Sequence, residues 1–496
     1  MMNNKHRFQK SPGPLKALYN LTGGLCLAAM PLEGMALSVE DFNFNGYGRS
    51  GIGNSSEGGK QETFTAVGVP YKYRLGNEND TFVELGLGGK VFEDDTSKFY
   101  LQSLVAYSIA QETDWEASEP ALRELNVRGE GVLPFAPEAS LWVGKRYYKR
   151  HDIHMTDFYY LGMQGPGAGA ENFDLGFAKF SAAWMRNTQT YEYYRTKKCA
   201  IDMKNAKEAS IAFDVLDFRL EDIELNQNGK LTAALQYSTG NVSDGLGEVF
   251  LNQYGVKTVT ASDVCNESCE ENICKKETKD STGRAITKTY SKSDLEKSGF
   301  MLSFIHNQSE FLGGSNQLIL QYAKDSGSAW GFGTNGLGYA NLDALETNKL
   351  YRFIDTGVIK LGNSIEMQYV AGFSKLYFKK QTEKKDQDWI TFGIRPVFFW
   401  DNTMSTALEL GYDKVKKSVV HKDDNGKPTD FKNSNLTKIT LAQQWSAGTG
   451  YWARPQIRVF GTYAKWNKDS KGKIGGTPFA DKTKGWTYGA QGEIWW

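Results

Sequence analysis

The sequence has no long hydrophobic run, and no stretch approaches the roughly 18 consecutive apolar residues that a membrane-spanning helix requires. It also has no excess charge of either sign, because 58 lysine and arginine residues balance 58 aspartate and glutamate residues. Only 40% of the chain is hydrophobic. A helical membrane protein is therefore excluded. A transmembrane β-barrel is not excluded, because its strands alternate apolar and polar residues and their average is hydrophilic.

Proline is scarce, with 12 residues against 52 glycines, whereas aromatic residues reach 13% and include 25 tyrosines and 12 tryptophans. The length of 496 residues alone would allow two to four soluble domains of ordinary size, but this composition disfavours them. Helical heptads are absent, and so is any repeat with a period of 20 to 50 residues. Propellers and solenoids are therefore disfavoured.

The first 36 residues resemble a secretory signal. A basic stretch precedes the apolar run Leu18–Met30, and small residues follow up to Ala36, where we expect cleavage. Removal of this segment would take away Glu33 and four basic residues: Lys5, Arg7, Lys10 and Lys16. The mature chain, residues 37–496, is then slightly acidic, and no nucleic-acid partner is expected.

Cysteine is also scarce: five residues, of which Cys26 lies in the predicted signal. The remaining four, an even number in an exported chain, favour two disulfides, but the sequence leaves all three connectivities open. A metal knot is the rival interpretation, because three of the four are closely spaced. It is disfavoured because an exported chain reaches an oxidising compartment, where disulfides form, and the spacing also lacks a paired C-x-x-C. The four residues are Cys199, Cys265, Cys269 and Cys274.

Strand-like alternation is clearest over Trp486–Trp496 and recurs over Lys98–Ile109 and Tyr451–Tyr463. Each segment has one apolar-aromatic face and one polar face, as in a barrel with lipid outside and water inside. At roughly 25 residues for each strand with its loop, the mature chain forms about 18 strands. A barrel of that size leaves an aqueous channel.

Some strands place an aromatic residue on the polar face, and four such residues stand beside charged ones: Tyr47, Phe82, Trp452 and Trp495. A sugar ring has apolar C–H faces that lie flat on aromatic rings, and a rim of hydroxyls that needs donors and acceptors. Several shallow, equivalent sites favour transport over tight binding. The pattern therefore predicts a channel for sugars.

Longer motifs then become recognisable. The sequence closely resembles the maltoporin family of outer-membrane sugar porins from about Asp41 to Trp496, most strongly before Gly176 and after Ile390. The motifs are Gly46-Tyr-Gly-Arg-Ser-Gly-Ile-Gly53, Lys72-Tyr-Arg-Leu-Gly-Asn-Glu78, Asp114-Trp-Glu-Ala117, Gly144-Lys-Arg-Tyr-Tyr-Lys-Arg-His-Asp-Ile-His-Met155, Gly165-Pro-Gly-Ala-Gly169 and Glu493-Ile-Trp-Trp496.

The resemblance implies an all-β fold, an 18-stranded antiparallel transmembrane barrel in the outer membrane of a Gram-negative cell. It also implies a homotrimer and a third outer loop folded inward as a constriction. Trp115 would reach into the neighbouring subunit's channel. A sixth ring position falls at or near Ser315, where no aromatic residue stands. The implied aromatic slide comprises Tyr47, Phe82, Trp115, Trp452 and Trp495.

The resemblance further implies facilitated diffusion of maltose and maltodextrins, with no cofactor. Arg150 and Tyr159 favour a maltodextrin channel over a sucrose porin, whereas Gly162 replaces an acid of the family. A general diffusion porin, or a channel for another sugar such as sucrose, stays open. The implied polar track and constriction comprise Arg49, Arg74, Glu84, Arg123, Arg150, Asp152, Asp157 and Tyr159.

Other chemistry is disfavoured. His151 and His154 with nearby carboxylates have ligand-like spacing, but a hydrogen-bonded constriction accounts for them in a porin. Gly165–Gly169 faintly resembles a dinucleotide loop but follows no βαβ strand, so we expect it to let the constriction loop bend. No lipid-facing His–Ser pair supports an enzyme.

The segment from about 242 to 297 is charged, contains three of the four remaining cysteines, and exceeds an ordinary turn in length. We expect an exposed, disulfide-tied outer loop. An adhesive role, or a contact with phage or another surface ligand, stays open for it. Calcium binding between subunits also stays open.

Overall fold

The computed structural model describes residues 41–69, 71–110, 113–197, 200–201, 207–242, 249–251, 289–290, 296–326, 347–379, 386–417 and 433–496. Several predictions therefore lie outside the described residues: the signal segment 1–36, all four remaining cysteines and most of the loop 242–297. Within the described part of the chain, no helix is both long and apolar enough to cross a membrane.

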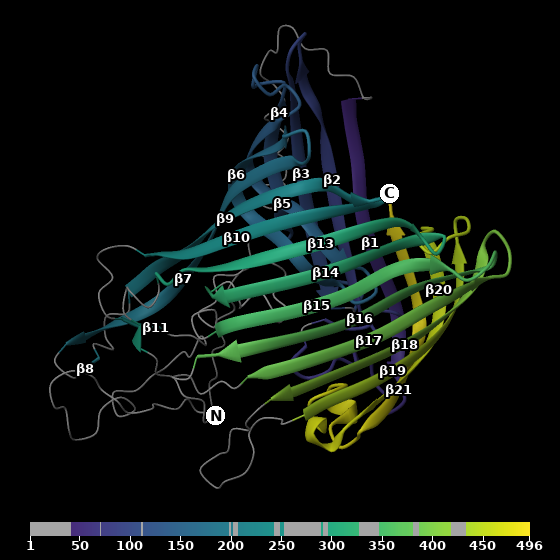
Figure 1. The fold of residues 1–496 in the computed structure, drawn as a ribbon. Helices are drawn as coiled ribbons and strands as arrows, with labels where there is room; N and C mark the ends of the chain where they lie inside the picture. The colour runs from purple at the N-terminus through teal and green to yellow at the C-terminus, as the bar shows by residue number, and fades with distance from the viewer. Residues whose placement is uncertain are drawn as a thin grey trace, which may run out of the picture. The chain divides into compact units, whose positions relative to one another are not determined.

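The described residues form twenty-one strands and two short 3-10 helices (Figure 1). The first ten strands are β1 (Phe42–Ser55), β2 (Asp80–Glu93), β3 (Lys98–Ala110), β4 (Ala121–Glu130), β5 (Ser140–Ile153), β6 (Phe158–Asp174), β7 (Lys179–Lys197), β8 (Ala200–Ile201), β9 (Lys207–Asn226) and β10 (Gly229–Val242). The others are β11 (Val249–Leu251), β12 (Thr289–Tyr290), β13 (Gly299–Phe311), β14 (Gly314–Asp325), β15 (Thr347–Lys360), β16 (Ile365–Phe378), β17 (Gln387–Phe399), β18 (Met404–Lys417), β19 (Asn433–Ser446), β20 (Gln456–Trp466) and β21 (Lys484–Trp495), with η8 (Lys468–Ser470) and η9 (Thr477–Phe479).

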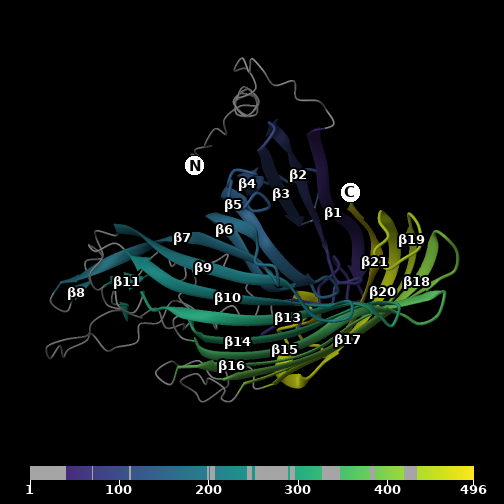
Figure 2. The same cartoon turned by 45° about the horizontal axis from the view of Figure 1, so that its top comes forward.

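Antiparallel neighbours close this sheet into a barrel. Each long strand pairs with the next along the chain, β7 pairs with β9 and β10 with β13, and β1 pairs with β21 (Figure 2). Without the three short strands β8, β11 and β12, eighteen of the described strands form the ring. Closure leaves no free edge, so every backbone group along the ring has a partner in the membrane. The predicted 18-stranded antiparallel fold is confirmed.

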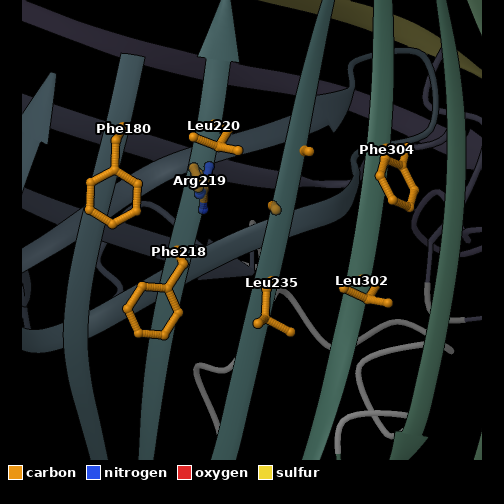
Figure 3. A pocket seen from close by; sticks show the side chains of 9 residues that line it. Phe180, Phe218, Arg219, Leu220, Leu235, Leu302 and Phe304 are labelled. Carbon is orange, nitrogen blue, oxygen red and sulfur yellow. The ribbon is translucent and has the colours of Figure 1, made fainter. Parts of the chain in front are cut away.

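The predicted alternation is seen directly on the wall. Phe218 and Leu220 project outward from β9, whereas Arg219 between them points to the other face, where it donates to the Asp217 carboxylate at 2.8 and 3.1 Å. Figure 3 shows this outward surface continuing over the neighbouring strands. Its other large apolar side chains are Phe180 of β7, Leu235 of β10, and Leu302 and Phe304 of β13.

The two barrel ends differ in their connections. At the end where the C-terminus lies, the links are short, such as 227–228 and 312–313. At the opposite end the β1–β2 link covers 56–79. Outer-membrane barrels have short periplasmic turns and longer extracellular loops. We therefore assign the end with the long connections to the outer face.

The link 56–79 crosses the barrel interior instead of standing outside it. Leu75 is fully buried and its carbonyl accepts a hydrogen bond from Lys438 Nζ on β19 at 2.6 Å. The Tyr73 hydroxyl lies 2.6 Å from Thr391 Oγ1 on β17. Because buried backbone groups need partners, these interior side chains hold the link against the wall.

A second link, the short β5–β6 turn 154–157, also reaches the far wall. Arg395 on β17 donates to the carbonyl of Met155 at 3.4 Å, and the Tyr160 hydroxyl donates to Gln317 Oε1 on β14 at 2.6 Å. β14 and β17 are not neighbours of β5 or β6 in the sheet. The third connection at the outer end is thus turned inward.

Aromatic side chains join both inward links to the wall. The ring of Tyr71 lies 4.6 Å from that of Phe158 and 5.0 Å from that of Trp389 on β17, between centroids. All three side chains are buried. Their packing fixes the two inward links relative to β17.

Two local predictions are wrong. The segment predicted as a strand over Tyr451–Tyr463 is one only from Gln456, because the chain turns at 451–452 and bends at 455. Gly165–Gly169 forms no bend of the constriction loop but lies within β6. There the absence of a side chain leaves room for Trp142, since a Cβ on Gly169 would lie 2.6 Å from its indole nitrogen.

Candidate functional site

Three of the predicted slide residues form one row on the interior face. Tyr47 on β1 is directly opposite Trp495 on β21 in the strand register. The Tyr47 ring lies 6.1 Å from that of Phe82 on β2, between centroids. The strand register and this ring distance therefore bring Phe82, Tyr47 and Trp495 together on one face.

Trp452 joins the row by a different route. It lies in the turn before β20, not on a strand, and it is 46% exposed. The ring of His154 stands edge-on between the two tryptophans, 5.4 Å from Trp452 and 5.6 Å from Trp495. The sequence analysis considered His154 as a metal ligand or as part of a hydrogen-bonded constriction, and it did not predict that the ring would join the tryptophans. We name Phe82, Tyr47, Trp495, His154 and Trp452 the aromatic row.

Trp115 stands apart from the aromatic row. It lies in the β3–β4 link and is 89% exposed. Its backbone N–H donates to Thr113 Oγ1 at 3.2 Å, while the indole projects from the surface. Its predicted entry into a neighbouring subunit's channel stays a prediction.

A cavity of about 340 Å³ opens beside the aromatic row, within the range of about 300–1,000 Å³ typical of small-molecule sites. Ser315 lines this cavity at the position where the resemblance implied a sixth aromatic ring, and the Ser315 side chain is exposed. One side of the cavity is aromatic and the rest is largely polar. Its walls are formed by Asp152, Ile153, His154, Ser315, Gln317, Thr356, Gly357, Val358, Gln368, Trp452 and Trp495.

A buried carboxylate, Glu493, holds one edge of the row. The Tyr47 hydroxyl donates to Glu493 Oε1 at 3.0 Å, and Arg454 donates to Oε2 at 2.9 Å. Arg458 donates to the same oxygen, and Arg74 lies 3.3 Å from Oε1. Strand parity placed Glu493 and Arg458 on the interior face beside aromatic residues, but neither was among the predicted site residues. That parity is the signal that could have added them.

Arg74 connects this carboxylate to a second acid, Glu78, which Arg49 also contacts. Arg74 Nε donates to Glu78 Oε1 at 2.8 Å, and Arg49 Nη1 lies 3.5 Å from it. Although burial alone would raise the pKa of Glu78, Arg74 and Arg49 lower it to about 2. Arg49 also donates to both oxygens of Asp80, and its guanidinium lies 5.0 Å from the Phe82 ring centroid. Predicted Arg49 and Arg74 therefore flank the row.

The remaining predicted polar residues gather around Tyr147 of β5. Its hydroxyl donates to Glu84 at 2.9 Å and accepts from Arg123. The Arg150 guanidinium lies 3.5 Å from the Tyr147 ring centroid and 4.5 Å from that of Tyr159. Tyr147 is the centre of this group. The sequence analysis missed it because it selected the charged residues and not the aromatic ring that they all contact.

Asp152 and Asp157 occupy the β5–β6 hairpin, and both are exposed. Asp157 has a φ of 56°, in the left-handed region that aspartate tolerates in turns. Across the described residues, no group of three or more His, Cys, Asp or Glu side chains is placed to hold a metal ion. Because both side chains are exposed, their carboxylates can accept hydrogen bonds from a ligand.

His154 is expected to make ligand binding insensitive to mild acid. Its burial, followed by the charge of Arg74, lowers its pKa well below the usual 6.5. Nδ1 lies 3.2 Å from Arg74 Nη1, and the neutral ring can accept that hydrogen bond. Because the folded pKa is lowered well below 6.5, the ring stays neutral as the pH falls through 6.5, where only the unfolded chain gains the proton. Ligand half-saturation should therefore stay constant across this pH.

A titration of ligand-induced current block at pH 7.5, 6.5 and 5 tests this expectation, with His154→Gln as the control that cannot titrate. A change of about threefold or more centred near pH 6.5 in the natural protein, and absent from the variant, would show that His154 gains a charge in the channel.

Residues 42–269 and 270–496 each match the sequence profile described as LamB porin. Among solved structures, the chain is similar to OccK5 (OpdH) of Pseudomonas aeruginosa, with 11% identity and a TM-score of 0.42 over 92% of this chain and 99% of that chain.

More distant likenesses include OprD of Pseudomonas aeruginosa, with 8% identity and a TM-score of 0.42 over 92% of this chain and 96% of that one. OmpT of Vibrio cholerae, in its trimer form, has 8% identity and a TM-score of 0.35, covering 91% and 99%. The family assignment rests on the profile, whose two matches together span the barrel. The chain belongs to the LamB porin family, the maltoporins, and is a multi-pass β-barrel channel of the outer membrane.

Proposed function

We propose that the channel carries maltose and maltodextrins by facilitated diffusion along the aromatic row. The observation that carries the proposal is the unbroken sequence of rings from Phe82 to Trp452, with charged groups along its edges. Glucose units stack on aromatic rings through their C–H faces. Their hydroxyls exchange water for charge-assisted hydrogen bonds to the flanking carboxylates and guanidiniums.

The arrangement of charges supports movement as well as binding. Glu493 and Glu78 are already paired with arginines. A sugar hydroxyl that moves along the row therefore meets oriented hydrogen-bond donors and acceptors and not an unpaired charge. Several shallow contacts of similar strength let a chain of sugars advance with little change in free energy. Asp152, Asp157, Arg150 and Tyr159 form the proposed constriction on the inward hairpin.

The proposal includes assembly as a homotrimer. Trp115, exposed on the β3–β4 link, would then line the channel of a neighbouring subunit. An exposed indole is unfavourable in water, and burial against a neighbour would remove that cost.

A planar-bilayer titration with maltose, maltotriose and sucrose tests the proposal. We expect saturable block of the ion current, with maltotriose binding more tightly than maltose because it covers more rings, and with sucrose binding weakly. Linear, non-saturating behaviour with all three sugars would instead indicate a general diffusion porin. A preference for sucrose would reassign the substrate.

A ring placed at Ser315 should strengthen binding. Ser315 lines the cavity beside Trp452 and Trp495, and the side chain is exposed there. Ser315→Phe would extend the row, and one added stacking contact contributes about 0.5–1.5 kcal/mol. Maltotriose half-saturation should fall by about twofold to tenfold. Ser315→Ala, which adds no ring, should leave it unchanged. Equal affinities of the two variants would contradict an aromatic row that continues past Trp452.

A further inference from the structure

The outer surface of the barrel carries a row of lysines at one rim. They stand on strands β14 to β21, at the end with the long connections, at positions with outward strand parity. We name this set the lysine collar. Its members are Lys324, Lys349, Lys375, Lys414, Lys416, Lys465 and Lys484.

The collar lies directly beyond a band of outward-facing aromatic side chains. Tyr322 pairs with Tyr351 across β14 and β15, and their ring centroids are 5.2 Å apart. Tyr463 pairs with Trp486 across β20 and β21, at 4.7 Å. Aromatic residues mark the level where membrane hydrocarbon meets the headgroups. The facing lysines on β14, β15, β20 and β21 lie two residues beyond these aromatic residues, toward the strand ends, and therefore stand at headgroup level.

Four of the lysines form two pairs that the sheet register sets directly opposite each other. Lys324 faces Lys349, and Lys465 faces Lys484. Like charges directly opposite on an antiparallel pair are destabilising. Among the described residues, which include the whole β20–β21 link, no acidic side chain lies within ion-pair distance of Lys465 or Lys484.

Other outward charges near this level are compensated within the protein. On β7 and β9, Arg186 donates to both carboxylate oxygens of Asp214 at 2.7 and 2.8 Å. Within the collar itself, Lys375 lies 3.5 Å from Asp388. The two facing lysine pairs therefore differ from these outward charges, each of which lies beside a charge of opposite sign.

We propose that the lysine collar binds the phosphate groups of an anionic glycolipid of the outer leaflet, lipid A. A phosphate between two facing ammonium groups would accept hydrogen bonds from both and remove their mutual repulsion. The acyl chains would then lie on the apolar strand surface below the aromatic band. The proposal rests on the position of the barrel in the outer membrane and is independent of the transported sugar.

The test uses the full-length protein purified in detergent and measures its thermal unfolding midpoint against added lipid A. We expect Lys465→Gln/Lys484→Gln to weaken binding about thirtyfold, because each lysine near an anionic surface contributes about fivefold. Without lipid, this variant should be at least as stable as the natural protein, since repulsion is relieved. That second readout separates lost binding from lost folding.

Two matched variants complete the design. Lys465→Arg/Lys484→Arg keeps both charges and should retain binding. Lys230→Gln/Lys360→Gln removes two exposed charges at the opposite rim, and should also bind as the natural protein does. Natural affinity in Lys465→Gln/Lys484→Gln would overturn the proposal. So would equal binding of dephosphorylated lipid A, or equal stabilisation by inorganic phosphate, which would indicate a free-anion site.

Discussion

Replacing Trp452 and Trp495 together by alanine is expected to abolish saturable block by maltodextrins while basal ion conductance persists. Both rings line the cavity, and His154 stands edge-on between them. Loss of two stacking contacts removes about 1–3 kcal/mol of binding, which raises the half-saturation concentration by roughly fivefold to 150-fold. The ion path survives because the paired charges around Glu493 remain.

The matched control replaces two tryptophans on the outer wall. Trp400 and Trp445 are 60% and 43% exposed at the same end of the barrel, on its outward surface. Trp400→Ala/Trp445→Ala should leave maltodextrin half-saturation unchanged, because neither ring faces the channel. If the Trp452→Ala/Trp495→Ala variant kept the natural half-saturation, the aromatic row would not be the sugar path.

Replacing Glu409 by glutamine is expected to destabilise the barrel interior by about 3–5 kcal/mol. The Glu409 carboxylate is fully buried and accepts hydrogen bonds from Arg395 and from Lys438 Nζ, the latter at 2.7 Å. Neutralising it leaves two buried cations without a counterion. Since Lys438 also donates to the carbonyl of Leu75, the inward link 56–79 loses part of its anchorage.

Urea-induced unfolding and limited trypsin digestion measure the two consequences. We expect a lower unfolding midpoint and new cleavage after Lys72, inside the link. Glu93→Gln is the control, because Glu93 pairs with Lys98 at the exposed rim at 2.9 Å and should change neither readout. If trypsin cleaved Glu409→Gln after Lys72 no faster than the natural protein, the Glu409 charge would not be needed to hold the link 56–79 in place.

Much of the barrel was predictable because strand parity has a fixed period of two. Parity alone placed Tyr47, Phe82 and Trp495 on the interior face, where the structure brings them together. The C-terminal alternation likewise matches β21, on which Trp486 and Tyr488 are exposed and Thr487 and Glu493 are buried.

The interior links were not predictable in the same way. Segment 56–79 has no strand period, and its partners are remote in the sequence, as with Leu75 and Lys438. His154 became part of the row only through the inward turn that carries it to Trp452 and Trp495. Such contacts depend on tertiary closure, which local periodicity does not report.

The central claim is that sugar rings lie on the aromatic row, and a structure of the protein crystallised with maltotriose tests it most directly. We predict glucosyl units stacked on Tyr47, Trp495 and Trp452, with hydroxyls within hydrogen-bond distance of Glu493, Arg74 or Asp152. Sugar bound elsewhere in the channel, with the faces of these three rings unoccupied, would contradict the account.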